Sequence, residues 1–196
     1  MNKLWPYLTP GIPDALFVRG RVPMTKEEVR AVTLAKARLA PNQVIWDVGS
    51  GTGSLAVEAA RLVGGGEVYA VERNPEGVAL IRENARRFGL DNIRIEQGTA
   101  PQALSALPAP HRVLIGGSGG RLAGILETVQ NRLLPGGGLI INAVTVETLS
   151  VLSLLPPSWQ VEVTQISAAR GEKVGSSHLL RALNPVFIIS AWKGDA

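Results

Sequence analysis

The feature that most constrains the fold is a repeated alternation of short apolar runs with segments of helical pattern. The β-like runs lie at 44–46, 68–71, 92–96, 113–115 and 139–143. Helical patterns follow them at 54–63, 75–88, 101–107, 121–133 and 145–155. Because strands joined through helices run parallel in one sheet, this order predicts an α/β fold with helices on both faces of a mostly parallel sheet.

Both ends of the chain depart from this alternation. Two β-rich segments, 159–166 and 177–192, follow each other with no long helix between them, which predicts a C-terminal antiparallel hairpin. Residues 1–24 contain four prolines and no apolar period, which predicts an irregular N-terminal arm. Thr25 with Glu28 forms a capping-box pattern at the start of a helix. The chain length of 196 residues fits one domain, which we place at 25–196.

A glycine-rich loop, Asp47-Val48-Gly49-Ser50-Gly51-Thr52-Gly53, joins the first strand to its helix. In open α/β sheets, ligands bind at the carboxyl ends of the strands, where this loop lies. Glycine can adopt positive φ and lets a ligand approach the backbone, and a helix N-terminus favours a carboxylate or phosphate. The loop therefore predicts ligand-binding residues: Gly49, Ser50, Gly51, Thr52 and Gly53.

Two acidic residues indicate which ligand the loop takes. Asp47 stands at the start of this loop, before its glycines, where an anion suits a ligand with an ammonium or sulfonium charge better than a pyrophosphate. Glu72 ends the second strand, where a carboxylate can accept hydrogen bonds from ribose hydroxyls. Ser54 occupies the third glycine's place in the dinucleotide pattern, so NAD fits less well. A tight turn without a ligand is the remaining alternative.

Composition excludes several kinds of site. The chain has no cysteine and two histidines, which excludes a disulfide scaffold, a thiolate zinc site and a cysteine nucleophile, and predicts no metal. Its formal charge of +4 lies within residues 1–38, on a solvated face or a surface for a polyanion. With no signal-peptide pattern and no apolar run of membrane-spanning length, we expect a soluble, cytoplasmic protein without membrane contact.

The glycine loop and the run Val-Tyr-Ala-Val-Glu72 resemble the first two motifs of class I S-adenosylmethionine-dependent methyltransferases. This resemblance implies a Rossmann-like fold with a seven-stranded sheet and S-adenosylmethionine as cofactor. It also implies that the loop from Gly49 to Gly53 meets the methionine part, Glu72 the ribose, and the segment ending at Ala100 the adenine. Thr99 stands where this class usually has an aspartate.

Further segments along nearly the whole chain resemble the decarboxylating precorrin methyltransferases of cobalamin biosynthesis. They are Gly11-Ile12-Pro13-Asp14, Pro23-Met24-Thr25-Lys26, Gly98-Thr99-Ala100-Pro101, Ile115-Gly116-Gly117-Ser118-Gly119-Gly120, Asn142-Ala143-Val144-Thr145-Val146-Glu147-Thr148, Ala169-Arg170-Gly171 and Asn184-Pro185-Val186. The resemblance implies methylation of carbon 15 of cobalt-precorrin-6B and loss of the ring C acetate carboxyl as carbon dioxide. It also implies a homotetramer, a separate precorrin C(5) methyltransferase as partner, and Thr25 as a cofactor contact.

The tetrapyrrole that the resemblance implies is expected to lie over the sulfonium of the cofactor. A flat macrocycle needs space, which the glycine-rich exit of the fourth strand would provide at Gly116, Gly117, Ser118 and Gly119. Glu147, which follows the fifth strand, is a further candidate that faces the reacting region. Because the substrate carries several carboxylates, arginine and lysine side chains are candidates for binding it. The clamp candidates are Arg19, Arg21, Arg170, Lys173 and Arg181. The residue that assists decarboxylation stays unassigned.

Two other functions compete with this hypothesis. The sequence pI of 9.8 favours an RNA methyltransferase of the same fold. The fourth strand lacks the Asn/Asp-Pro-Pro-Tyr type of exit, and a cysteine nucleophile is missing, so we expect no nucleic-acid partner. A non-catalytic or NAD-binding Rossmann protein is the third possibility.

Overall fold

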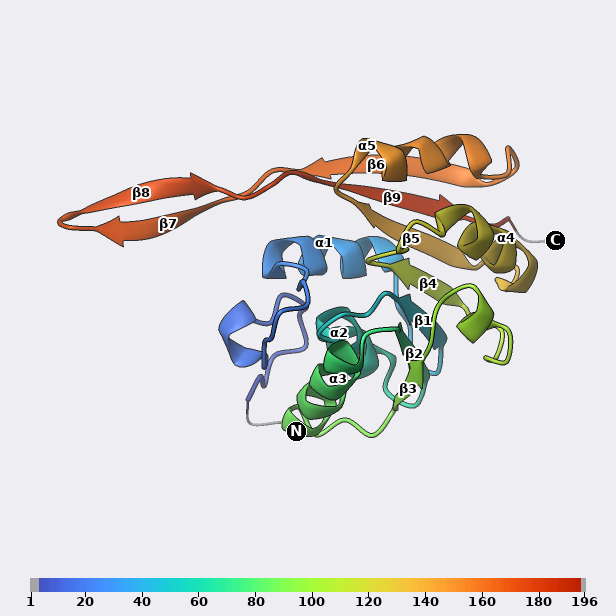
Figure 1. Cartoon of the computed structure of the whole chain (residues 1–196), viewed down its shortest axis with the longest axis horizontal. Coiled ribbons are helices and arrows are strands. Elements are labelled where there is room, and N and C mark those ends of the chain that lie inside the picture. The colour runs from blue at the N-terminus through green and yellow to red at the C-terminus, as the bar shows by residue number, and fades with distance from the viewer. Residues whose placement is uncertain (1–3, 195–196) are drawn as a thin grey trace.

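The computed structural model describes residues 4–194 and contains a seven-stranded sheet of order β3-β2-β1-β4-β5-β9-β6 (Figure 1). Strands β1 to β5 run parallel, and β9 lies antiparallel between β5 and β6. This confirms the predicted fold class. The strands are β1 Val44–Val48, β2 Glu67–Glu72, β3 Ile93–Gln97, β4 Arg112–Ile115, β5 Gly138–Ala143, β6 Gln160–Ile166 and β9 Val186–Trp192.

Helices cover both faces of the sheet (Figure 1). One buried cluster joins the sheet to α1, α2 and α3, and the other joins it to α4 and the segment after α5. The α-helices are α1 Glu27–Ala37, α2 Ser54–Val63, α3 Pro75–Arg87, α4 Leu122–Arg132 and α5 Val146–Leu149. Short 3₁₀ turns lie at Asp14–Leu16, Gln102–Leu104 and Ser150–Leu154.

Two predicted helices are shorter in the structure than the sequence indicated. The segment 101–107 forms only one 3₁₀ turn, and 145–155 is one α-helical turn that continues as a 3₁₀ helix. The hydroxyls of Ser105, Ser150 and Ser153 each donate to the carbonyl three residues earlier. Such local bonds compete with regular helix formation.

The predicted C-terminal hairpin contains four strands rather than two. Strands β6 and β9 pair within the main sheet, while β7 Ala169–Val174 and β8 Ser177–Ala182 form a separate two-stranded ribbon. This β7–β8 ribbon projects away from the body (Figure 1). Pro185 separates β8 from β9, and proline cannot donate to a strand ladder, so the single strand predicted at 177–192 is divided.

The N-terminal segment packs against the body of the protein. Ile12 and Phe17 are buried with Val57 of α2 and with Phe88, which ends α3. The rings of Phe17 and Phe88 lie 5.0 Å apart between centroids. The segment therefore belongs to the packed core and lies near the carboxyl edge of the sheet.

Candidate active site at the carboxyl edge of the sheet

A cavity of about 290 Å³ opens where β1, β2 and β4 end. The N-terminal segment supplies one wall, and the loops after these strands and after β3 supply the others. The lining residues from the part of the chain that the structure describes are Val22, Pro23, Thr25, Asp47, Val48, Gly49, Ser50, Gly51, Ser54, Leu55, Val71, Glu72, Arg73, Asn74, Gly98, Thr99, Ala100, Gly116, Gly117, Ser118 and Gly119.

The sheet itself anchors these loops. The backbone N–H groups of Gly49 and Ser50 both donate to the carbonyl of Val71 at the end of β2, at 3.0 and 3.1 Å. Gly116 donates to Val48 at 3.0 Å, which ties the loop after β4 to the end of β1. The position of each loop is therefore set by the neighbouring strand.

Two glycines of the β1 loop lie where a side chain would not fit. Gly49 has a φ of +69°, and an added Cβ would lie 2.2 Å from the carbonyl oxygen of Gly117. Gly51 has a φ of +58°, and its Cβ would lie 2.8 Å from the carbonyl oxygen of Pro23. The loop is thus packed between the β4 exit and the N-terminal segment, with its backbone facing the cavity.

Glu72 faces this loop from the end of β2. Its Oε2 accepts the backbone N–H of Gly51 at 2.9 Å, and its Oε1 accepts that of Asn74 at 2.8 Å. A carboxylate has about four lone-pair sites, so each oxygen keeps one for a ligand. The carboxylate is therefore oriented by the backbone, and it lines the cavity as an acceptor for hydroxyl groups.

Asp47 lies fully buried at the base of the cavity. Its Oδ2 accepts the hydroxyl of Ser50 at 2.6 Å, while Oδ1 has no hydrogen-bond partner among residues 4–194. Burial raises the pKa of this carboxyl from its ordinary 3.8 to about 6, although the Ser50 hydroxyl and the Ala56 backbone act in the other direction. An unpartnered carboxylate oxygen in such a position favours a ligand with a donor or a positive charge.

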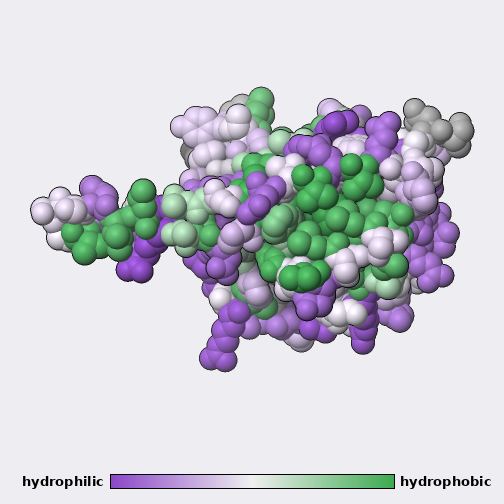
Figure 2. Space-filling model, turned by 90° about the horizontal axis from the view of Figure 1, so that it is seen from above, coloured by the Kyte–Doolittle hydropathy of each residue, from purple (hydrophilic) through white to green (hydrophobic). Residues whose placement is uncertain are grey.

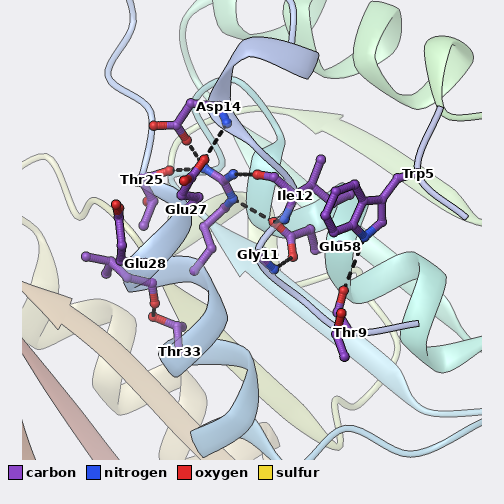
Figure 3. A network of polar contacts seen from close by, with 12 residues as sticks. Trp5, Thr9, Gly11, Ile12, Asp14, Thr25, Glu27, Glu28, Thr33 and Glu58 are labelled. Atoms are coloured by element: carbon purple, nitrogen blue, oxygen red, sulfur yellow. Dashed lines mark hydrogen bonds and ion pairs between the residues drawn. The ribbon is translucent and has the colours of Figure 1, made fainter. Parts of the chain in front are cut away.

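Arg30 of α1 fastens the N-terminal wall of the cavity. It is completely buried, and its guanidinium donates to Asp14 at 2.8 Å and to Glu58 of α2 at 2.7 Å. It also donates to the carbonyls of Ile12 and Thr25, at the two ends of the N-terminal segment. Figure 3 shows these partners converging on one point. One side chain therefore holds both ends of the segment that carries Pro23 and Thr25.

Arg170 of β7 extends this network. Its guanidinium donates to both oxygens of Glu28 at 2.7 Å and to Asp14 at 3.1 Å. The Arg170 pairing lowers the pKa of Glu28. The prediction of a capping box between Thr25 and Glu28 is wrong, because the Glu28 carboxylate binds Arg170 instead. The helix begins at Glu27, and its N-cap residue Lys26 makes no side-chain capping hydrogen bond. The β7–β8 ribbon is thereby joined at its base to the N-terminal segment.

Most of the residues predicted from the sequence meet around this one cavity. Those that line it are Thr25, Gly49, Ser50, Gly51, Glu72, Ala100, Gly116, Gly117, Ser118 and Gly119. Outside the lining lie Thr52, Gly53, Glu147 and Arg170. Gly53 packs against Ile81 of α3, and Thr52 has a buried hydroxyl without a partner in the described chain.

The remaining clamp candidates Arg19, Arg21, Lys173 and Arg181 also lie outside the lining. Arg181 is ion-paired with Glu172 on the β7–β8 ribbon. Pro23, Arg73 and Asn74 line the cavity but were missed by the sequence analysis. The only signal for Arg73 was its place directly after Glu72. Within residues 4–194, no group of histidine and acidic side chains could hold a metal ion, and no helix is long and apolar enough to span a membrane.

The strand order, the reversed β9 and the glycine loop facing an acid at the end of β2 define a class I methyltransferase fold. An S-adenosylmethionine-dependent O-methyltransferase from Thermotoga maritima shares this fold with a TM-score of 0.72, at 20% identity. The profile described as "Precorrin methyltransferase domain" matches residues 13–193. The chain belongs to this precorrin methyltransferase family.

Individual relatives match over almost their whole length. A "Probable cobalt-precorrin-6B C(15)-methyltransferase (decarboxylating)" from Pyrobaculum calidifontis is 45% identical over 193 residues, covering 96% of this chain and 98% of that protein. The enzyme of the same activity from Salmonella typhimurium is 38% identical, covering 93% and 96%. The crystal structure of a precorrin-6y C5,15-methyltransferase from Geobacter metallireducens has a TM-score of 0.90 at 41% identity, covering 95% of this chain and 100% of that one.

Proposed function

We propose that this chain is an S-adenosylmethionine-dependent methyltransferase of cobalamin biosynthesis. Its substrate is cobalt-precorrin-6B, which it methylates at carbon 15 while the ring C acetate loses carbon dioxide. Two relatives that carry this activity in their names match along nearly the full chain. The single structural observation that supports the proposal most strongly is the Glu72 carboxylate, which lines the cavity and accepts the backbone N–H of Gly51.

The cavity residues fit S-adenosylmethionine. Glu72 keeps one acceptor site on each oxygen for the two ribose hydroxyls. The loop backbone at Gly49 and Gly51 lines the cavity where the methionine part would lie, and α2 starts here without a side-chain cap at Gly53. The free N–H groups of that helix end suit the cofactor carboxylate. Asp47, with one unpartnered oxygen, suits its ammonium group.

The cofactor supplies an electrophilic methyl group on a sulfonium, with a neutral leaving group. The protein therefore needs to align donor and acceptor more than it needs a strong base. The anchored loops after β1 and β4 provide that alignment, because each is hydrogen-bonded to a neighbouring strand. Thr25 and Ala100 close the cavity from the N-terminal segment and from the β3 exit.

The loop from Gly116 to Gly119 is the proposed platform for the macrocycle. Three of its four residues have no side chain, so a flat ring system can approach the methyl donor closely. Glu147 and Arg170 are further candidate substrate contacts, although both lie outside the cavity lining. For Arg170 this would require the substrate to compete with Glu28 and Asp14 for its guanidinium.

The assembly and location of the enzyme are also proposals. A homotetramer is supported by apolar surface on the ribbon, at Leu179 and Leu180, and on the side of α5 and β6 (Figure 2). Exposed apolar residues on that side are Val146, Leu152, Leu154, Val161 and Val163. A cytoplasmic location agrees with the cysteine-free sequence, and a separate enzyme would carry out the precorrin C(5) methylation.

The decisive experiment is incubation with cobalt-precorrin-6B and S-adenosylmethionine, followed by mass spectrometry. The expected product has gained one methyl group and lost one carbon dioxide. Transfer of the methyl group to RNA instead would favour the alternative function, an RNA methyltransferase of the same fold. Calorimetry with S-adenosylhomocysteine and NAD adds an independent check: binding of NAD but not of S-adenosylhomocysteine would contradict the proposal.

A further inference from the structure

Arg73 is an exposed residue that lines the cavity. It follows the last residue of β2, but its guanidinium reaches the loop after β4, although β1 lies between these two strands. An added Cβ at Gly119 would lie 3.0 Å from Nη1 of Arg73 and 3.2 Å from its Cζ. Gly119, which has a φ of +57°, thus leaves the space that the arginine head occupies.

Among the described residues, none is paired with the positive charge of Arg73. Among residues 4–194, no hydrogen bond, ion pair or ring contact involves its guanidinium. It is also the one basic residue among the described residues that line the cavity, whereas Asp47 and Glu72 are both held by the β1 loop. A guanidinium placed in this way is available to pair with an anion of a ligand.

The position of Arg73 indicates whether its anion is the carboxylate of the cofactor or a carboxylate of the substrate. The carboxylate of the cofactor has its own site at the uncapped N-terminus of α2, beside Ser54 and Leu55. The head of Arg73 lies instead against Gly119, in the loop assigned above to the macrocycle. A carboxylate that meets Arg73 there therefore comes from the substrate.

We propose that Arg73 binds a carboxylate side chain of the tetrapyrrole and so fixes its orientation over the methyl donor. This inference rests on the proposed function and assigns a specificity-determining residue to it. The bound carboxylate is one that the product retains. An ion pair stabilises a carboxylate but not the carbon dioxide formed from it, so pairing with the reacting acetate would oppose its loss.

The test compares Arg73→Gln and Arg73→Lys with the wild type. The matched control is Arg82→Gln, which removes the same charge from an exposed position on α3 outside the cavity. Tetrapyrrole affinity is measured by absorbance titration of cobalt-precorrin-6B in the presence of S-adenosylhomocysteine, so that no turnover occurs. Affinities for S-adenosylhomocysteine and for 5′-methylthioadenosine, which lacks the amino acid part, are measured by calorimetry.

Arg73→Gln is expected to weaken tetrapyrrole binding ~10–100-fold through the lost charged hydrogen bonds, with both nucleosides bound as by the wild type. The tetrapyrrole affinity of Arg73→Lys should lie between those of Arg73→Gln and the wild type, and that of Arg82→Gln should match the wild type. At saturating substrate, the ratio of carbon dioxide released to methyl transferred should be unchanged by Arg73→Gln.

Four results would overturn the proposal. Unchanged tetrapyrrole affinity would remove Arg73 from the substrate site. Weaker binding of S-adenosylhomocysteine alone would assign Arg73 to the cofactor carboxylate, and weaker binding of both nucleosides to the adenosine. A changed ratio of the two products would place Arg73 on the reacting acetate. Failure of the wild type to bind the tetrapyrrole while it binds S-adenosylhomocysteine would instead refute the proposed function.

Discussion

The backbone N–H of Gly51 donates to Oε2 of Glu72 at 2.9 Å and joins the glycine loop to the end of β2. The two residues are 21 positions apart in the chain but belong to neighbouring strand exits. This bond orients the carboxylate before any ligand arrives. Such preorganisation lets the loop and the acid act as one binding unit.

Replacing Glu72 tests that unit. Glu72→Ala should weaken S-adenosylhomocysteine binding by ~1–3 kcal/mol, because charged hydrogen bonds to the ribose are lost. Calorimetry measures the change. Glu83→Ala, which removes an exposed carboxylate on α3 outside the cavity, is the control and should leave the affinity unchanged. Equal affinity of Glu72→Ala and the wild type would remove Glu72 from the cofactor site.

A side chain at Gly51 should displace the N-terminal wall. Gly51→Ala combines a left-handed backbone, which costs L-residues about 1–2 kcal/mol, with a Cβ 2.8 Å from the carbonyl of Pro23. Both stability in urea and S-adenosylhomocysteine affinity should fall. Gly175→Ala has a φ of +61° and nothing within 4 Å of its Cβ, so it isolates the backbone cost. If both variants keep the wild-type affinity, the contact between Gly51 and Pro23 does not shape the site.

Arg30 should be indispensable for the N-terminal wall. Arg30→Met leaves the buried carboxylate of Glu58 without its cation and Asp14 with Arg170 alone, which should lower the free energy of unfolding by about 3–5 kcal/mol. Arg30→Lys should not restore the lost stability, because an ammonium cannot make all four hydrogen-bonding contacts of the planar guanidinium. Urea unfolding measures both. Arg86→Met breaks an exposed pair and should leave the unfolding midpoint nearly unchanged.

The raised pKa of Asp47 predicts how stability depends on pH. Because the folded state binds this proton up to about pH 6 and the unfolded chain only to about its ordinary 3.8, stability should fall as pH rises through this window. The loss attributable to Asp47 is about 3 kcal/mol when complete. Asp47→Asn removes this pH-dependent loss. The stability of the variant relative to the wild type should therefore increase from pH 4 to pH 7.5. Urea unfolding at both pH values measures this difference, and a constant difference would mean that Asp47 does not titrate as stated.

Local patterns in the sequence identified the glycine loop as part of the candidate site because parallel strands end at one edge of a sheet. Gly49, Gly51 and Glu72 are near their own strand ends, so alternation and spacing placed them together. The same reasoning assigned Gly116 to Gly119 to the cavity from the exit of β4. No long-range contact had to be known for these residues.

Long-range ion pairs were beyond such reasoning. Glu28 has the spacing of a capping box with Thr25, yet its carboxylate binds Arg170, 142 residues further along the chain. Arg30 lies on the buried side of α1 beside Thr33 and Leu34, and its position in the sequence does not indicate its partners. Only the folded chain shows which opposite charges meet.

The sequence by itself determined the parallel sheet, its reversed C-terminal strand and the place of the glycine loop, because these follow from hydrophobic periodicity and strand direction. The tertiary structure alone decided that Arg30 holds the N-terminal segment at the cavity, that Arg170 pairs with Asp14 and Glu28, and that Arg73 reaches across β1 to Gly119. These features depend on side chains from distant segments, whose meeting is set by packing in three dimensions and not by spacing along the chain.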